Sequence, residues 1–234
     1  MRARTPVVGG TLGLFVTVAV LHLGAQLTGA GDLADATQVL LMPLLALTLW
    51  LQTAAPRSRL VVLTLVALGL SWLGDSAPKL TDGDTAFLVM VGFFLLAQIA
   101  YIAAFWPYRA NSVLHVRRPL LLGYVAAVAG LVAACVGGAA GMLAPVLVYG
   151  ALLGTMAVLS TGVNPLTAVG GVLFLVSDGL IALNAFADGF DLPGQGFWVM
   201  ATYLAAQSLI VAGVLRETAR TSTPHTQTDA VRST

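Results

Sequence analysis

The stretch PLTAVGGVLFLVSDGLIALNAFA, residues 165–187, is mainly apolar and contains one charged residue, Asp178. A helix of about 20 apolar residues crosses a bilayer core of about 30 Å, so this stretch predicts a membrane-spanning helix. An aspartate at the centre of such a helix costs roughly 2.5 to 3.5 kcal/mol to insert. The segment SWLGDSAPKL at 71–80 places Asp75 in a similar setting. Two such acids predict a functional site inside the membrane.

Similar apolar stretches occupy most of the remaining chain, in which 58% of the residues are hydrophobic and 9% are charged. This composition is typical of a polytopic membrane protein. The predicted fold class is all-α, with a single transmembrane domain over 1–216 and a polar, disordered cytoplasmic tail over 217–234. The expected spanning helices, about eight in number, are 7–28, 35–54, 59–77, 85–106, 119–137, 141–160, 165–187 and 195–216.

The basic residues predict the orientation of the bundle. Every arginine lies on one side of an eight-helix threading, and Lys79 lies on the other side. The positive-inside rule then places both termini in the cytoplasm, and we expect the inner (plasma) membrane as the location. A net charge of +1 offers no basic surface for nucleic acid, so membrane lipids are the expected surroundings.

An internal repeat is indicated by the third and seventh expected helices. Aligning them superposes Thr64 on Thr167, Val66 on Val169, Leu70 on Leu173 and Asp75 on Asp178. The following helices share FLLAQ at 94–98 and YLAAQ at 203–207. Two sets of four helices would form a parallel repeat about an axis along the membrane normal. Chance similarity between Leu-, Val- and Ala-rich helices is the competing interpretation.

Other polar residues near the two acids have a functional and a structural interpretation. Gln98 and Gln207 either face a substrate or hydrogen-bond between helices as structural contacts. Lys79, one turn beyond Asp75, either forms an ion pair with it or extends to the membrane interface. No metal-binding or phosphate-binding motif is present, so we expect no metal and no cofactor.

Several motifs stand out along the expected helices: LLMPLLAL at 40–47, SWLGD at 71–75, VGFFLLAQIAYIAAF at 91–105, GGVLFLVSD at 170–178 and TYLAAQSLI at 202–210. Together they resemble the YhhN-type lysoplasmalogenase family over most of the membrane region. The resemblance implies about eight membrane helices and hydrolysis of the vinyl-ether bond of lysoplasmalogens, which releases a fatty aldehyde and a glycerophospho-base. Gln98 stands where many members have His, and Met42 where many have Lys, which removes a proton donor and a phosphate ligand.

The chemistry implied by this resemblance uses two carboxyls. Cleavage of a vinyl ether begins with protonation of its β-carbon, and water then captures the resulting oxocarbenium ion. This requires one protonated and one ionised carboxyl, a division that two close acids in a low-dielectric site favour. Asp75 and Asp178 are therefore the expected catalytic residues. The sequence does not indicate which of them is the acid and which is the base. The expected substrate-binding residues are Lys79, Phe94, Gln98, Tyr101, Phe174, Ser177, Tyr203 and Gln207.

Other classes of protein remain open from the sequence. Paired intramembrane carboxyls also suit a proton-coupled transporter of small molecules or lipids, although no clearly broken helix pair is apparent. An intramembrane aspartyl protease fits less well, because WLGD and VSD lack the YD and GxGD contexts of that class. A lipid-binding or purely structural membrane protein is a further alternative. The sequence does not predict an oligomeric state.

Overall fold

The computed structural model describes residues 4–222, and these residues form helices and loops without a strand. Eight helices are long and apolar enough to cross a membrane, which confirms the predicted all-α membrane fold. They are α1 (Arg4–Thr28), α2 (Gly31–Gln52), α3 (Arg59–Ser76), α4 (Gly83–Phe105), α5 (Arg118–Cys135), α6 (Leu143–Ser160), α7 (Pro165–Phe186) and α8 (Gln195–Ser222). Three short 3₁₀ helices lie between them: η1 (Ala77–Leu80), η2 (Trp106–Asn111) and η3 (Ala140–Met142).

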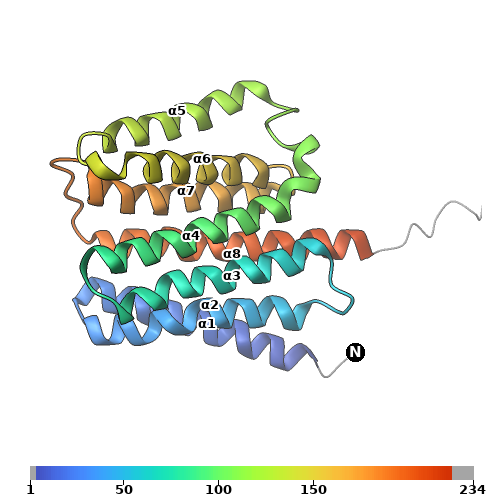
Figure 1. Cartoon of the computed structure of the whole chain (residues 1–234). Helices are drawn as coiled ribbons and strands as arrows, with labels where there is room; N and C mark the ends of the chain where they lie inside the picture. Colours follow the sequence, from blue (N-terminus) through green and yellow to red (C-terminus); the bar gives the residue numbers. More distant parts are fainter. Residues whose placement is uncertain (1–3, 223–234) are drawn as a thin grey trace, which may run out of the picture.

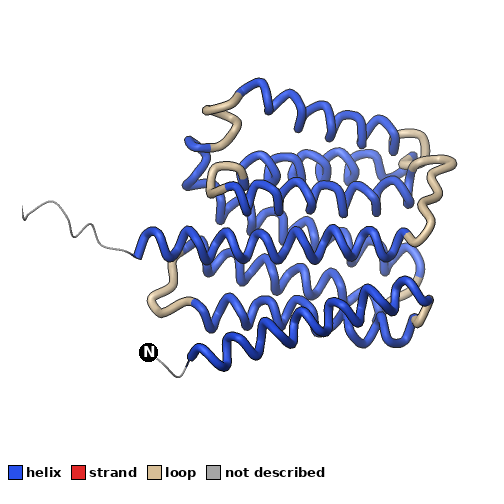
Figure 2. Tube along the Cα trace, turned by 180° about the vertical axis from the view of Figure 1, so that it is seen from behind, coloured by secondary structure: helices blue, strands red, loops and turns tan. Residues whose placement is uncertain are grey.

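The eight helices lie side by side in one bundle, and the two ends of the described chain lie at the same end of it (Figure 1). Loops gather at the two ends of the bundle, as expected when each helix spans the same slab (Figure 2). The most extensive contacts between helices are those of α7 with α8, α3 with α4, and α1 with α2. Helix α5 lies at the periphery, where among the long helices it packs only against α6 and α7.

Helix α7 is fixed at its start by Asn164. The side-chain oxygen of Asn164 accepts hydrogen bonds from the backbone N–H groups of Leu166 and Thr167, at 3.1 and 3.2 Å. Its side-chain nitrogen donates to the backbone oxygen of Gly213 on α8, at 2.8 Å. One residue thus satisfies free N–H groups of α7 and also joins α7 to α8. The two helices that carry Asp178 and Tyr203 are held together at this end.

The structure differs from the expectation at the end of α8. The helix was expected to end at 216, but it continues to Ser222. Polar contacts within the last turns support the extension, because Arg220 pairs with Glu217 at 3.6 Å and the Thr221 hydroxyl donates to the carbonyl of Glu217 at 3.2 Å. The ion pair, three residues apart, stabilises this turn by roughly 0.2–0.5 kcal/mol. The remainder of the expected tail, 223–234, lies outside the described residues.

Candidate active site

Both acids line one open cavity of about 420 Å³. The cavity lies between α2, α3, α4, α7 and α8. Its residues Asp75, at the end of α3, and Gln195, at the start of α8, belong to the end of the bundle opposite the two ends of the described chain (Figure 1). Its polar lining residues are Gln38, Asp75, Ser177, Asp178, Asn184, Gln195 and Tyr203, and its apolar ones include Met90, Phe94, Ile181 and Met200. The last turn of α3 and the middle of α7 therefore bring two carboxyls to the same space.

Asp75 accepts hydrogen bonds on both carboxyl oxygens. The Tyr203 hydroxyl donates to Oδ2 at 3.0 Å, and the side-chain amide of Gln38 donates to Oδ1 at 3.4 Å. Asp75 is only 8% exposed, so these neutral donors replace most of the water that a carboxyl normally binds. Because both of its oxygens accept hydrogen bonds, the Asp75 carboxyl is suited to the ionised form.

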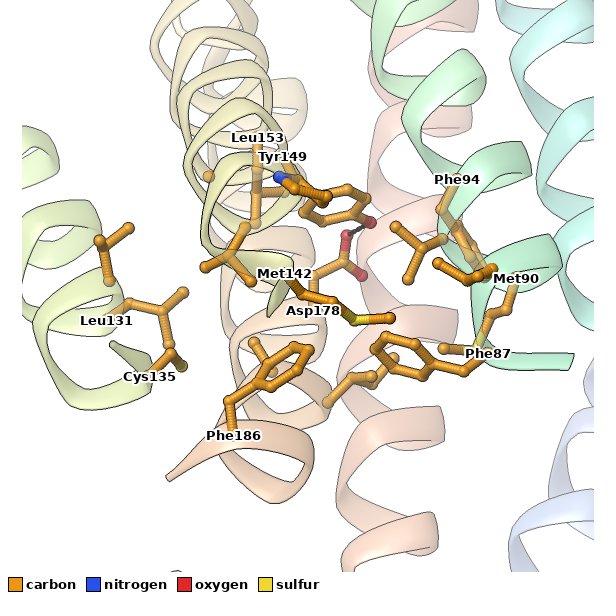
Figure 3. A pocket seen from close by; sticks show the side chains of 18 residues that line it. Phe87, Met90, Phe94, Leu131, Cys135, Met142, Tyr149, Leu153, Asp178 and Phe186 are labelled. Atoms are coloured by element: carbon orange, nitrogen blue, oxygen red, sulfur yellow. Dashed lines mark hydrogen bonds between the residues drawn. The ribbon is translucent and has the colours of Figure 1, made fainter. Parts of the chain in front are cut away.

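Asp178 has a different set of partners. The Tyr149 hydroxyl donates to its Oδ2 at 2.5 Å (Figure 3), and the amide of Gln98 donates to the same oxygen at 3.4 Å. Within residues 4–222, no hydrogen bond reaches Oδ1 of Asp178. One oxygen therefore holds the side chain in place, while the other is free to carry a proton or to meet a ligand.

The donors follow the same pattern in the two halves of the chain. Asp75 on α3 receives one bond from α2 and one from α8, whereas Asp178 on α7 receives one from α6 and one from α4. Each acid is thus bonded by the second helix of its own half and by the fourth helix of the other half. This exchange is the arrangement that a four-plus-four repeat predicts. Neither half alone supplies all the partners of its own aspartate.

A buried layer lies behind the cavity. The Tyr101 hydroxyl donates to the side-chain oxygen of Gln207 at 2.5 Å, and the Gln207 nitrogen donates to the Ser71 hydroxyl at 3.1 Å. The ring of Phe174 packs edge-on against Tyr101 and Tyr203, with centroids 6.2 and 5.7 Å away. These contacts hold Tyr203 in the orientation in which its hydroxyl reaches Asp75.

The expected substrate-binding residues therefore divide into three groups. Phe94, Ser177 and Tyr203 line the cavity together with the acids. Gln98, Tyr101, Phe174 and Gln207 are fully buried and do not line it, so in this structure they support the site from behind. Lys79 alone forms the third group, because it neither lines the cavity nor lies buried behind it.

Lys79 forms an ion pair with Asp35 on α2. An ion pair between Lys79 and Asp75, one of the two sequence interpretations, is therefore wrong. Asp35 precedes Gln38 by one helical turn, and Lys79 follows Asp75 by one turn, so the pair lies just beyond the Gln38–Asp75 hydrogen bond. Both side chains are partly exposed, at 29% and 65%, which is expected at a rim. The long stem of Lys79 extends to the charged end of α2 because an ion pair inside the bundle would cost more.

Sequence reasoning missed Gln38 and Tyr149, which donate directly to the two acids. The signal that could have found them is the same one that drew attention to Asp75 and Asp178. Tyr149 is an isolated polar side chain in PVLVYGALLG, and Gln38 is the last polar residue before the apolar run VLLMPLLAL on α2. Such residues require a partner inside the bundle. Among residues 4–222, no group of three or more His, Cys, Asp or Glu side chains is placed to hold a metal ion.

The fold and site together define a class: polytopic membrane proteins with a carboxyl pair in an intramembrane cavity. The YhhN family model matches residues 33–214, and the chain belongs to the YhhN family. It is 32% identical over 219 residues to a protein named lysoplasmalogenase from Mycobacterium tuberculosis, covering 88% of this chain and 80% of that protein. It is 30% identical over 176 residues to lysoplasmalogenase TMEM86B of Mus musculus, covering 74% and 73%. No solved structure matches the chain at a significant level.

Proposed function

We propose that this protein is a membrane-embedded hydrolase that cleaves the vinyl-ether bond of lysoplasmalogens, giving a fatty aldehyde and a glycerophospho-base. The observation that carries the proposal is the shared cavity, in which Asp75 and Asp178 face the same space with different hydrogen-bond partners. Relatives named lysoplasmalogenase support it. The comparisons give the transporter alternative no support.

The reaction uses the two carboxyls in turn. One carboxyl gives its proton to C2 of the alkenyl chain, and the π electrons of C1=C2 form the new C–H bond, leaving an oxocarbenium ion at C1 and oxygen. Water adds to C1 while the other carboxylate takes a proton from it. The hemiacetal then collapses: its hydroxyl proton returns to the first carboxylate, the C1–O(glycerol) bond breaks, and the second carboxyl protonates the departing oxygen. Both acids end in their starting states.

Proton transfer to carbon gives the direct test. When the purified protein in lipid hydrolyses a lysoplasmalogen in D₂O, we expect the aldehyde, trapped as the alcohol by immediate borohydride reduction, to carry one deuterium at C2. The matching 1-O-alkyl lysophospholipid lacks the double bond and should release nothing. Absence of aldehyde from the vinyl ether, or aldehyde without deuterium at C2, contradicts this function.

The charged rim fits a zwitterionic headgroup. Lys79 and Asp35 already neutralise each other, and a lysolipid phosphate with its amine can replace this pair with one contact of each sign. We expect Lys79→Ala to raise KM about tenfold and leave kcat within about twofold, because the contact is equal in ground and transition states. Lys79→Arg is the matched control and should keep most of the affinity. An unchanged KM in Lys79→Ala removes Lys79 from the site.

We further propose that both termini are cytoplasmic in the plasma membrane, that 1–216 is one transmembrane domain, and that 217–234 extends it into the cytoplasm. The distribution of arginine between the loops supports this orientation. The cavity then opens toward the outer leaflet. A C-terminal green fluorescent protein fusion should fluoresce and a C-terminal alkaline phosphatase fusion should be inactive; the reverse pattern overturns the orientation.

A further inference from the structure

A second cavity reaches Asp178 from another direction. It lies between α4, α5, α6 and α7 and has a cavity volume of about 70 Å³. Figure 3 shows the side chains that line it. Its walls are apolar, and among its lining side chains only Tyr149 and Asp178 carry oxygen. Figure 3 shows the Asp178 carboxyl and the Tyr149 hydroxyl meeting at the centre, with Phe87 and Phe186 toward one end. An apolar pocket that ends at a carboxyl is suited to a ligand with an apolar chain and one reactive group.

The two cavities share Asp178 but not Asp75. Asp178, Met90, Phe94 and Ile181 line both of them, whereas Asp75 lines only the polar one. The cavities therefore meet at Asp178. A ligand that occupied both would pass Asp178 at the boundary between its apolar and polar parts.

We propose that the apolar pocket receives the alkenyl chain of the lysolipid, so that Asp178 protonates C2 and Asp75 activates the water that adds to C1. This inference rests on the proposed function. The assignment of the two roles follows from the order of atoms in the substrate, which is chain, C2, C1, ether oxygen and glycerol. With the chain in the apolar pocket and the glycerol in the polar cavity, C2 lies on the side of Asp178, and C1 and the ether oxygen lie on the side of Asp75.

The hydrogen bonds agree with this division of roles. Oδ1 of Asp178 receives no donor from residues 4–222, so it can hold the proton that moves to C2. Both oxygens of Asp75 accept from neutral donors, which suits a carboxylate that stays ionised until it takes a proton from water. When the hemiacetal collapses, Asp178 regains a proton from the hemiacetal hydroxyl, and Asp75 gives its proton to the departing glycerol oxygen.

The chain can enter from the side of the bundle. Helix α4 packs against α3 and α6 but not against α5, so helix packing does not close the pocket between α4 and α5. The cavity volume of about 70 Å³ is well below the ~300–1,000 Å³ of a pocket that holds a whole drug-sized ligand, so the cavity is too small for a long chain. Met90 and Met142 line the pocket, and methionine side chains are flexible enough to make way for the first carbons. The remaining carbons then extend between α4 and α5 into the bilayer.

A pair of valines on α6 tests the pocket. Val146 lines it, whereas Val148, two residues along, is 51% exposed toward the lipid side. We expect Val146→Trp to raise KM for a C16 lysoplasmalogen at least tenfold, and much less for a C4 analogue. Val148→Trp should match the unmodified protein with both substrates, and thermal melting in detergent should be equal for the two variants. If the two variants have equal kinetics with both substrates, the chain does not bind in this pocket. That result would leave the hydrolase function unaffected.

A binding measurement separates this inference from the hydrolase function. A 1-O-alkyl lysophospholipid with a terminal diazirine on its chain is not a vinyl ether, so it binds without being cleaved. On irradiation we expect cross-links to α4, α5 or α6, with at least fivefold less labelling in Val146→Trp than in Val148→Trp. Cross-links confined to α1, α2 or α8 overturn the pocket. This result holds whether or not the protein hydrolyses lysoplasmalogens.

Azide tests the division of roles. In Asp75→Asn no base activates the water, so the Asp178 carboxylate takes the proton back from C2 and the vinyl ether re-forms. Azide can capture the oxocarbenium ion without a base, but it cannot protonate C2. We expect 1 M azide to raise the rate of substrate loss at least tenfold in Asp75→Asn and not in Asp178→Asn. Rescue of Asp178→Asn alone reverses the assignment, and rescue of neither or of both variants also overturns it.

Discussion

Replacing Asp178 with Asn should lower kcat/KM for a lysoplasmalogen by about 10³-fold, within the range of a lost general acid. The amide has nearly the same shape as the carboxyl and can still accept from Tyr149, but it has no acidic proton for carbon. Asp75→Asn should cause a loss of similar size, because the amide takes no proton from water. Aldehyde release from the purified variants in lipid measures both effects.

The control for this pair is Asp84→Asn, which changes an exposed aspartate in the first turn of α4. It should leave the rate unchanged. The melting temperatures of all the variants should stay within a few degrees of each other, since buried Asn keeps most of the hydrogen bonds. A fully active Asp178→Asn removes Asp178 from the chemistry. Loss of folding in both site variants would instead indicate a structural role for the two carboxyls.

Replacing Gly170 with Leu should cost about 3 kcal/mol of stability, the upper end of the usual range for overpacking. A Cβ at Gly170 would lie 2.8 Å from the backbone oxygen of Ala206 and 3.1 Å from the backbone nitrogen of Ile210, both on α8. Backbone atoms cannot move aside as side chains do, so α7 and α8 must separate. Because α7 carries Asp178 and α8 carries Tyr203, activity should fall together with stability.

Gly92→Leu is the matched control for that substitution, since a Cβ at Gly92 meets no atom within 4 Å. Thermal unfolding in detergent, followed by size-exclusion chromatography, measures both variants. Gly170→Leu should lose the monodisperse peak well below the temperature at which Gly92→Leu loses it. Equal stability of the two would show that the contact between α7 and α8 at this level is not tight.

The helices were predictable because the thickness of a bilayer sets the number of apolar residues that a spanning helix needs. The site was predictable only in part. Asp75 and Asp178 could be recognised because the membrane penalises an isolated charge far more than an isolated hydroxyl or amide. Tyr149 and Gln38 are less costly in an apolar helix, and their importance becomes visible only when the helices are placed beside the acids.

Which residues line the cavity was harder to predict than which residues surround it. Tyr203 and Gln207 lie one turn apart on α8, yet Tyr203 lines the cavity and Gln207 lies behind it. Spacing along a helix indicates that two residues share a face. It does not indicate how deep the cavity extends along that face, which depends on side chains of other helices. The partner of Lys79 was missed for a similar reason, since Asp35 lies on another helix.

The position of α5 makes the surroundings of the two carboxyls different. In the first half of the chain α1 packs against α8, but the equivalent contact in the second half, α5 with α4, is absent. A strict repeat would surround both carboxyls alike and could not distinguish the two ends of a lipid. By standing apart from α4, a single peripheral helix leaves an apolar pocket beside Asp178, whereas Asp75 lines only the polar cavity. Asp75 therefore faces the headgroup end of a lipid and Asp178 faces its chain, although both residues are aspartates.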